Sequence, residues 1–343
     1  MMRLLLLTLV LTAGAAVAQS SRPVEELRSS GGLAPHVVGQ FREPAAFQQA
    51  PSGDRYIFDR RGHRVYRVGP SGAATELVRI GPEDGRLLGA SAFHLGPDGR
   101  FVVADAPDGR ERVQIFDGDG ARLGGFRLPG RAAPRITMGD LVLSGVASLQ
   151  FTGRTIVMSQ PELGGLITAF SLNGHPYHTF GVFRRTGHEA DRELHLALNS
   201  GLPLVNPAGG YYFVFQAGAP LFRKYDDGGQ LLFERHVEGP ELDPLIAALP
   251  TVWPRRRDDG GRELPMVPPT VRAAAVDPDG YLWIALTVPY VYVYDPWGEK
   301  VRTLSLRGAG ILNPTSLSFA GRDRLLVTPR GYEFTVRPDA ARP

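Results

Sequence analysis

The chain contains no cysteine in its 343 residues, so disulfide bridges, thiolate metal ligands and a cysteine nucleophile are all excluded. It also lacks the G-x-S-x-G turn of hydrolases, histidines at zinc-site spacing and a glycine-rich phosphate loop beside a helix. The formal net charge is only +3, which gives no support to nucleic-acid binding. These absences remove the common enzyme signatures and turn attention to the pattern of turns and strands.

Long apolar runs are missing too, except near the start of the chain. Residues 1–18 contain Arg3, an apolar run over 4–13 and a small-residue cleavage site at 16–18, which together are typical of a signal peptide. The run is about ten residues, too short to span a bilayer of roughly 30 Å as a helix. We therefore expect export to a periplasm or the extracellular space, with an uncleaved anchor as the alternative. We expect no membrane span elsewhere and a flexible segment over 19–35.

What the chain does have is 42 glycines and 29 prolines, which indicate many turns and short strands. Turn glycines recur in pairs, and the distances within the pairs are 19, 21, 21, 20 and 18 residues. The pairs are Gly53 and Gly72, Gly99 and Gly120, Gly153 and Gly174, Gly209 and Gly229, and Gly280 and Gly298, with Gly321 opening a sixth unit. Such a constant internal distance is the mark of a repeat architecture.

Each unit carries four short apolar runs rich in β-branched and aromatic residues, as in RFVVAD and RVQIF, separated by turn residues. Six four-stranded antiparallel sheets predict an all-β fold, a six-bladed β-propeller over 36–338. The sixth unit ends before its fourth strand. We predict that the N-terminal stretch His36–Phe41 supplies this strand and closes the ring, which removes an exposed sheet edge.

The repeat resembles the NHL repeat, a P-x-G turn followed by an apolar strand, an Asp, R-V-x-x-F/Y and an acidic Gly turn. Asp105 with Arg112–Asp117 matches it best, and Asp59 with 63–66 matches next best, while units three and four diverge. The resemblance implies the propeller fold but leaves activity open, because that family includes binding scaffolds and lyases. Because Asp59 and Asp105 recur from unit to unit, we expect them to accept backbone hydrogen bonds in loops.

Two insertions, 182–199 and 239–270, fall between units and are predicted to lie on one face of the ring, where rigid scaffolds commonly place binding loops. In the first we expect two helical turns from Glu189 onward. In the second we expect a short helix that packs on the propeller as a lid, or covers its mouth as a mobile element. This helix would face the propeller through Leu242, Leu245, Ile246 and Leu249. The run 255–257 is a candidate anion site, although Asp258 and Asp259 would neutralise it.

The candidate ligand residues on this rim are His63, Arg110, Glu162, His188 and Tyr290. Blade-to-blade hydrogen bonding or simple solvation is the alternative role for each of them. A second candidate location is the axis of the ring. The polar residues that the inner strands offer there are Gln49, His94, Gln150, Asn206, Asp277, Ser316 and Ser318. This set holds few carboxylates for a calcium or zinc site.

We therefore predict an exported binding or interaction module that uses the insertion-bearing face. Its partner would be a protein, or a small-molecule or glycan ligand, and not a nucleic acid. The alternative is a metal-dependent hydrolase or lyase with its site at the central channel. No cofactor is predicted, and a divalent metal belongs only to this alternative.

Overall fold

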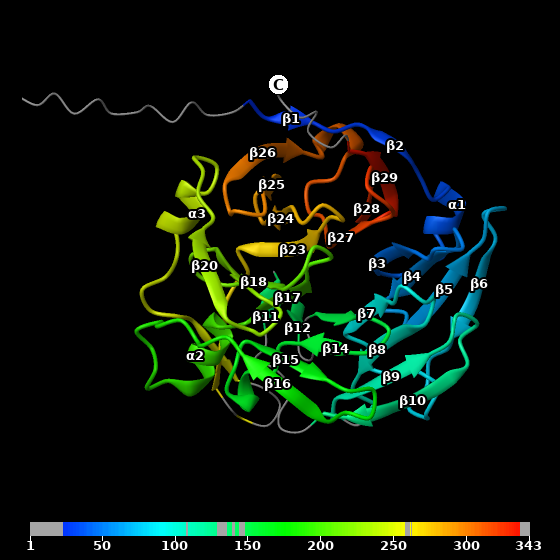
Figure 1. The fold of residues 1–343 in the computed structure, drawn as a ribbon, viewed down its shortest axis with the longest axis horizontal. Coiled ribbons are helices and arrows are strands. Elements are labelled where there is room, and N and C mark those ends of the chain that lie inside the picture. Colours follow the sequence, from blue (N-terminus) through cyan, green and yellow to red (C-terminus); the bar gives the residue numbers. More distant parts are fainter. Residues whose placement is uncertain are drawn as a thin grey trace, which may run out of the picture.

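The computed structural model describes residues 23–107, 109–128, 148–257, 261 and 263–336, together with the backbone of 136–138 and 141–143. The predicted signal peptide, residues 1–18, lies outside the described residues. Six sheets surround a central axis, and their strands follow the chain order from the inner to the outer edge (Figure 1). The predicted all-β, six-bladed propeller is confirmed.

The first three blades take their strands from the first half of the chain. Blade 1 holds β3 (Pro44–Gln49), β4 (Arg55–Asp59), β5 (Arg64–Val68) and β6 (Ala74–Val78); blade 2 holds β7 (Ala92–Leu95), β8 (Phe101–Asp105), β9 (Arg112–Phe116) and β10 (Arg122–Arg127); blade 3 holds β13 (Leu149–Phe151), β14 (Ile156–Met158), β15 (Ile167–Phe170) and β16 (Pro176–Phe180). The antiparallel hairpin of β11 (Ile136–Met138) and β12 (Leu141–Leu143) belongs to the link between blades 2 and 3.

The last three blades follow in the same order. Blade 4 holds β17 (Gly201–Val205), β18 (Tyr211–Phe215), β19 (Leu221–Tyr225) and β20 (Leu231–His236); blade 5 holds β23 (Val271–Val276), β24 (Leu282–Leu286), β25 (Val291–Tyr294) and β26 (Lys300–Ser305); blade 6 holds β27 (Ser316–Phe319), β28 (Arg324–Thr328) and β29 (Tyr332–Thr335). The turn glycines take the positive φ that the repeat requires, as Gly99 does at +81° and Gly280 at +87°.

The N-terminal segment closes the ring, but through different residues from those predicted. The outer strand of blade 6 is β2 (Ser29–Gly32), antiparallel to β29 with Ser29 opposite Phe334 and Gly32 opposite Tyr332. Just before it, β1 (Glu25–Glu26) runs parallel to β26 of blade 5. Strands β1 and β2 thus lie beside the last two blades (Figure 1).

The prediction of a strand at His36–Phe41 is wrong, because its first residues belong to a single helical turn, α1 (Pro35–Val38). Pro35 stands at the start of this helix, where its missing N–H costs nothing. The apolar side chains that suggested a strand are used for packing instead. Val37 is buried between blades 6 and 1, and the ring of Phe41 lies 5.0 Å from that of Tyr66.

The core is divided among the blade interfaces. Every pair of neighbouring blades shares its own cluster of buried apolar side chains. In the cluster between blades 1 and 2, for example, Phe101 and Phe116 of blade 2 stack with their ring centres 5.1 Å apart, and both are fully buried. This leaves the inner strands free to expose one side to the axis, where the channel runs.

The inserted segments pack on the propeller. The first contains α2 (Arg192–Leu198), whose Leu194 and Leu198 pack with Val267 of the second insertion. The second contains α3 (Asp243–Ala247) and the hairpin of β21 (Arg255–Arg257) and β22 (Glu263–Pro265). Leu242 is fully buried against the core between blades 4 and 5, where Leu245 and Ile246 join it. Short 3-10 turns, η1 (Pro161–Leu163) and η2 (Arg307–Ala309), complete the described elements.

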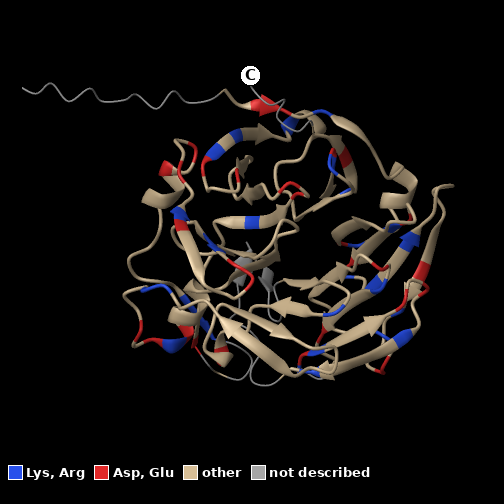
Figure 2. Ribbon diagram, viewed as in Figure 1, with Lys and Arg blue, Asp and Glu red and all other residues tan. Residues whose placement is uncertain are grey.

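Charged residues lie mainly on the outer strands and loops with both signs intermixed, and Arg272 on the inner strand β23 is an exception (Figure 2). No helix among the described residues is both long and apolar enough to cross a membrane.

Candidate functional site

The central channel contains the candidate site, a cavity of about 740 Å³ that opens among the tight turns after the inner strands. Four turn prolines line this mouth, namely Pro51, Pro97, Pro207 and Pro278. A second chamber of about 140 Å³ lies toward the other ends of the inner strands. The two chambers share lining residues from five blades, which are Gln48, His94, Gln150, Ala274 and Leu317. They are therefore adjacent parts of one channel.

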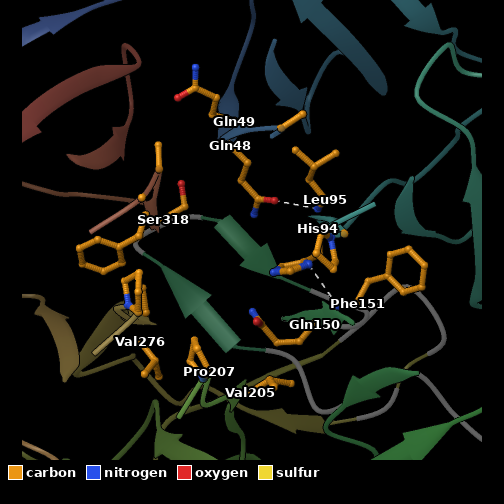
Figure 3. Close-up of a pocket in the computed structure, with 18 of the residues that line it drawn as sticks. Gln48, Gln49, His94, Leu95, Gln150, Phe151, Val205, Pro207, Val276 and Ser318 are labelled. Carbon is orange, nitrogen blue, oxygen red and sulfur yellow. Dashed lines mark hydrogen bonds between the residues drawn. The ribbon is translucent and has the colours of Figure 1, made fainter. Parts of the chain in front are cut away.

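One side of the channel is polar. Gln48, His94 and Gln150 come from the inner strands of blades 1, 2 and 3, and their side chains point into the cavity (Figure 3). Strand alternation explains this placement, because every second residue of an inner strand faces the axis while its neighbours enter the core. Phe47 and Phe93, for example, precede Gln48 and His94 and are buried between blades.

The opposite side is apolar. Leu204, Val205 and Val276 from blades 4 and 5 line it, together with Leu317 and Phe319 of blade 6. Figure 3 shows Val276 across the cavity from His94. A ligand bound here would meet hydrogen-bonding groups on one side and aliphatic surface on the other.

Side-chain hydrogen bonds between blades fix the polar side. The Oε1 of Gln48 accepts the backbone N–H of Leu95 at 2.7 Å, and the Nδ1 of His94 accepts that of Phe151 at 3.1 Å (Figure 3). Each bond runs from one inner strand to the next, so the two side chains have equivalent roles in neighbouring blades. An accepting Nδ1 places the ring proton of neutral His94 on Nε2, as a donor.

Burial among the inner strands lowers the pKa of His94 to about 4. The contact with Gln150 opposes this shift without cancelling it. The side chain is nevertheless partly accessible from the cavity. His94 is therefore a neutral hydrogen-bonding group at neutral pH.

The residues present do not fit a divalent metal centre. In the described part of the chain, no three His, Asp or Glu residues are grouped so that they could hold an ion. The described lining of both chambers contains no carboxylate, and the Nδ1 of His94 already accepts a backbone N–H. Calcium and zinc sites need several carboxylate, carbonyl or imidazole ligands at matching height.

Five of the polar inner-strand residues named from the sequence do line the channel: Gln49, His94, Gln150, Ser316 and Ser318. Asn206 and Asp277 instead stabilise turns. Asn206 accepts the N–H of Ala208 at 3.1 Å, and Asp277 accepts the indole N–H of Trp283 at 3.0 Å.

The sequence reasoning missed Gln48, Arg272 and Arg324, which also line the channel. The signal that could have found Gln48 is the two-residue periodicity of the inner strand counted back from the turn.

The five rim candidates are dispersed. The Nδ1 of His63 accepts the N–H of Ala90 at 3.3 Å, and burial lowers the pKa of this imidazole. The guanidinium of Arg307 lies 5.8 Å from the ring centre of Tyr290. Arg110 is exposed in the β8–β9 loop, Glu162 stands in η1, and His188 precedes α2. None of the five is among the described residues that line the channel, so their role as a ligand rim stays a prediction.

The structural role predicted for the repeated aspartates is confirmed. Asp59 accepts the backbone N–H groups of Arg42, Glu43 and Gly62 at 2.8–3.0 Å. Asp105 accepts the N–H of Leu88 at 3.1 Å and forms a buried ion pair with Arg112 at 2.8 Å. These bonds tie the links between blades to the sheets.

Comparisons with known proteins add support for the fold. No family model matches the chain, and no curated protein matches its sequence. The chain is similar to the solved structure of a streptogramin B lyase at 12% identity and a TM-score of 0.51, over 84% of this chain and 76% of that one. It is also similar to virginiamycin B lyase from Staphylococcus aureus, at 10% identity and a TM-score of 0.51 over 91% and 99% of the two chains.

A third similar structure is the PQQ-bound aldose sugar dehydrogenase from Streptomyces coelicolor, at 12% identity and a TM-score of 0.53 over 90% and 96% of the two chains. At these identities the likeness extends to the six-bladed propeller fold alone.

Proposed function

We propose that this protein is a binding module that holds a small amphipathic molecule in the channel of the propeller. The observation that carries the proposal is the cavity of about 740 Å³ on the axis, polar on blades 1 to 3 and apolar on blades 4 and 5. Ligand sites typically enclose roughly 300–1,000 Å³ and combine apolar walls with a few oriented polar groups.

The polar side is preorganised to recognise neutral hydrogen-bonding groups. The hydrogen bonds of Gln48 to Leu95 and of His94 to Phe151 hold both side chains in place without a ligand. The carboxamide nitrogen of Gln48 is left as a donor toward the cavity, and the Nε2–H of His94 lies beside Gln150. Because these side chains are already fixed, their ordering adds little to the entropic cost of binding.

The hypothesis that the insertion-bearing face is the binding surface has less support. Its two insertions pack on each other through Leu198 and Val267, and Arg255 forms an ion pair with Asp191 across them. The guanidinium of Arg184 donates to the carbonyl oxygens of Leu198 and Ala219 at 2.6 and 2.9 Å. This packing favours a structural cover, and binding of a protein partner at this face stays a second hypothesis.

A metal-dependent hydrolase or lyase at the channel is also less well supported. Lyases and a dehydrogenase occur among the similar structures, but at 10–12% identity they indicate only a shared fold. The amide, imidazole and hydroxyl groups of the described lining suit ligand binding better than divalent metal coordination.

We also propose that the protein is exported, because residues 1–18 have the charge, apolar run and cleavage site of a signal peptide. The ligand would then be met in a periplasm or outside the cell. Cell fractionation of the full chain and of a variant without residues 1–18 tests this, and identical distribution of the two would contradict it.

The channel proposal can be tested by closing the cavity from within. Ala274 lines both chambers, so Ala274→Trp places an indole in the channel. Leu123→Trp adds the same group on the outer strand β10, where Leu123 is 54% exposed. A fragment library is screened by saturation-transfer NMR against wild type and both variants.

We expect amphipathic fragments to bind wild type and Leu123→Trp, and to lose binding in Ala274→Trp. Fragments that bind all three proteins equally, or no binding to wild type, would overturn the proposal. Circular dichroism of the variants shows whether the propeller is intact.

A further inference from the structure

Among the described residues that line the channel, one arginine has no counter-ion. Among the described lining residues, Arg60 pairs with Glu43, and Arg324 pairs with Glu333 at 3.3 Å and donates to Gln49 at 2.7 Å. Arg272, by contrast, has no ion pair or side-chain hydrogen bond in the described part of the chain, and its Nε is buried without a partner. Its guanidinium reaches the smaller chamber from the inner strand β23.

This arrangement is unfavourable for folding. A half-buried charge without a partner loses part of its hydration and gains no Coulomb energy in return. Burial alone lowers the pKa of Arg272, and no charged neighbour contributes to the shift. A guanidinium nevertheless stays protonated at neutral pH, so the chamber keeps one uncompensated positive charge.

An unsatisfied acceptor lines the same chamber. The Oε1 of Gln216 is buried without a partner. The backbone carbonyl of Gln216 accepts the N–H groups of Thr270 and Val271 at 2.7 and 3.2 Å, which holds Gln216 next to the start of β23. A cationic donor and a neutral acceptor thus face one small space.

We infer that this chamber binds the head group of a 2-hydroxycarboxylate. The carboxylate accepts hydrogen bonds from Arg272, and the adjacent hydroxyl donates to the Oε1 of Gln216. The apolar body of the ligand lies along Leu202, Leu204 and Leu317 toward the larger chamber. This inference rests on the proposed function, because it names the ligand class of the same channel.

The charge balance favours a carboxylate over a phosphate. A single unpaired guanidinium is neutralised by a monoanion, and the fork of an arginine matches the two oxygens of a carboxylate. A phosphate monoester carries nearly two negative charges at neutral pH and would leave one of them buried and unpaired.

The test uses matched probes in calorimetric titrations at constant ionic strength. The probes are 3-phenyllactate, 3-phenylpropionate without the hydroxyl, 3-phenyllactamide without the charge, and phenyl phosphate. We expect 3-phenyllactate to bind at least ~10-fold more tightly than each of the others, since one charge-assisted hydrogen bond is worth about a factor of ten or more.

The variant Arg272→Met should weaken 3-phenyllactate binding by ~10-fold or more and leave 3-phenyllactamide binding unchanged. Because it replaces an unpaired, half-buried charge with an apolar side chain, its melting temperature should equal or exceed that of wild type. A purely structural arginine would give the opposite change in stability. Arg79→Met is the control, because it removes one positive charge from a side chain that is 75% exposed.

The outcomes separate the two proposals. If 3-phenyllactamide binds as tightly as 3-phenyllactate and Ala274→Trp abolishes both, the channel is a ligand site and the hydroxycarboxylate inference fails. Tighter binding of phenyl phosphate, or unchanged 3-phenyllactate binding in Arg272→Met, also overturns it. If Ala274→Trp does not weaken 3-phenyllactate binding, both proposals fail. If no probe binds wild type, the hydroxycarboxylate inference fails and the fragment screen decides the channel proposal.

Discussion

Replacing His94 with glutamine should reduce the loss of folding stability that this protein suffers on acidification. Burial lowers the pKa of His94 to about 4, whereas an unfolded histidine titrates near its ordinary value of about 6.5. Between these two values the unfolded state binds more protons than the folded state. The free energy of unfolding therefore falls as the pH drops from about 6.5 toward about 4.

The size of the effect follows from the two pKa values. Between about pH 7.5 and about pH 5, a shift from 6.5 to 4 lowers the free energy of unfolding by about 2 kcal/mol. Because the cavity admits water beside the imidazole, which screens part of the charge, we expect about 1–2 kcal/mol for the contribution of His94.

Glutamine is a suitable substitute because blade 1 already uses it. Gln48 accepts the N–H of Leu95 in the way that His94 accepts that of Phe151. His94→Gln should thus keep the acceptor and remove only the titration. The control is His236→Gln, in which an exposed histidine on the outer strand β20 is replaced.

The assay is urea unfolding of the three proteins at about pH 7.5 and about pH 5, with the linear extrapolation applied to each. Wild type and His236→Gln should lose about 1–2 kcal/mol more than His94→Gln on acidification. An equal loss in all three proteins would show that His94 titrates normally in the folded state, and would refute the burial of its imidazole.

Three further substitutions test the frame around the channel. Gly32→Ala should lower the free energy of unfolding by about 1–3 kcal/mol, because Gly32 has a φ of +146° and an added Cβ would lie 2.5 Å from the carbonyl oxygen of Gly331. Asp105→Asn should lower it by about 3–5 kcal/mol, since it leaves the buried guanidinium of Arg112 without its main partner. Leu242→Ala should cost about 2–5 kcal/mol, because Leu242 is fully buried under the second insertion. Thermal and urea unfolding measure all three effects.

Each substitution has a control within the chain. Gly31 has nothing within 4 Å of an added Cβ, so equal effects of Gly31→Ala and Gly32→Ala would argue against β2 as the closing strand. Asp84 also pairs with Arg112 at 3.1 Å but is 64% exposed, and Asp84→Asn should cost only about 0–1 kcal/mol. Val252 is 83% exposed, and if Leu242→Ala were as mild as Val252→Ala the second insertion would not be a packed cover.

The regular spacing of the turns was enough to predict the blades, because turn geometry and strand alternation depend only on residues close together in the chain. A glycine such as Gly99 must take a positive φ in a tight turn, and each strand must alternate between its two faces. The closing strand was placed wrongly because β2 contains no apolar signal. Its sequence is Ser-Ser-Gly-Gly. It pairs with β29 because that strand would otherwise have an unpaired edge, and the two strands are far apart in the chain, with 304 residues separating Ser29 from Glu333.

The sequence by itself therefore determined the sheets, their number and their order, because glycine spacing and strand periodicity act over a few residues. Only the tertiary structure decided which of the axis-facing side chains lie together. Gln48, Arg272 and Gln216 come from different blades and meet only because the ring closes. Their separation along the chain conceals this, since the channel is formed by the packing of whole sheets and not by any local pattern.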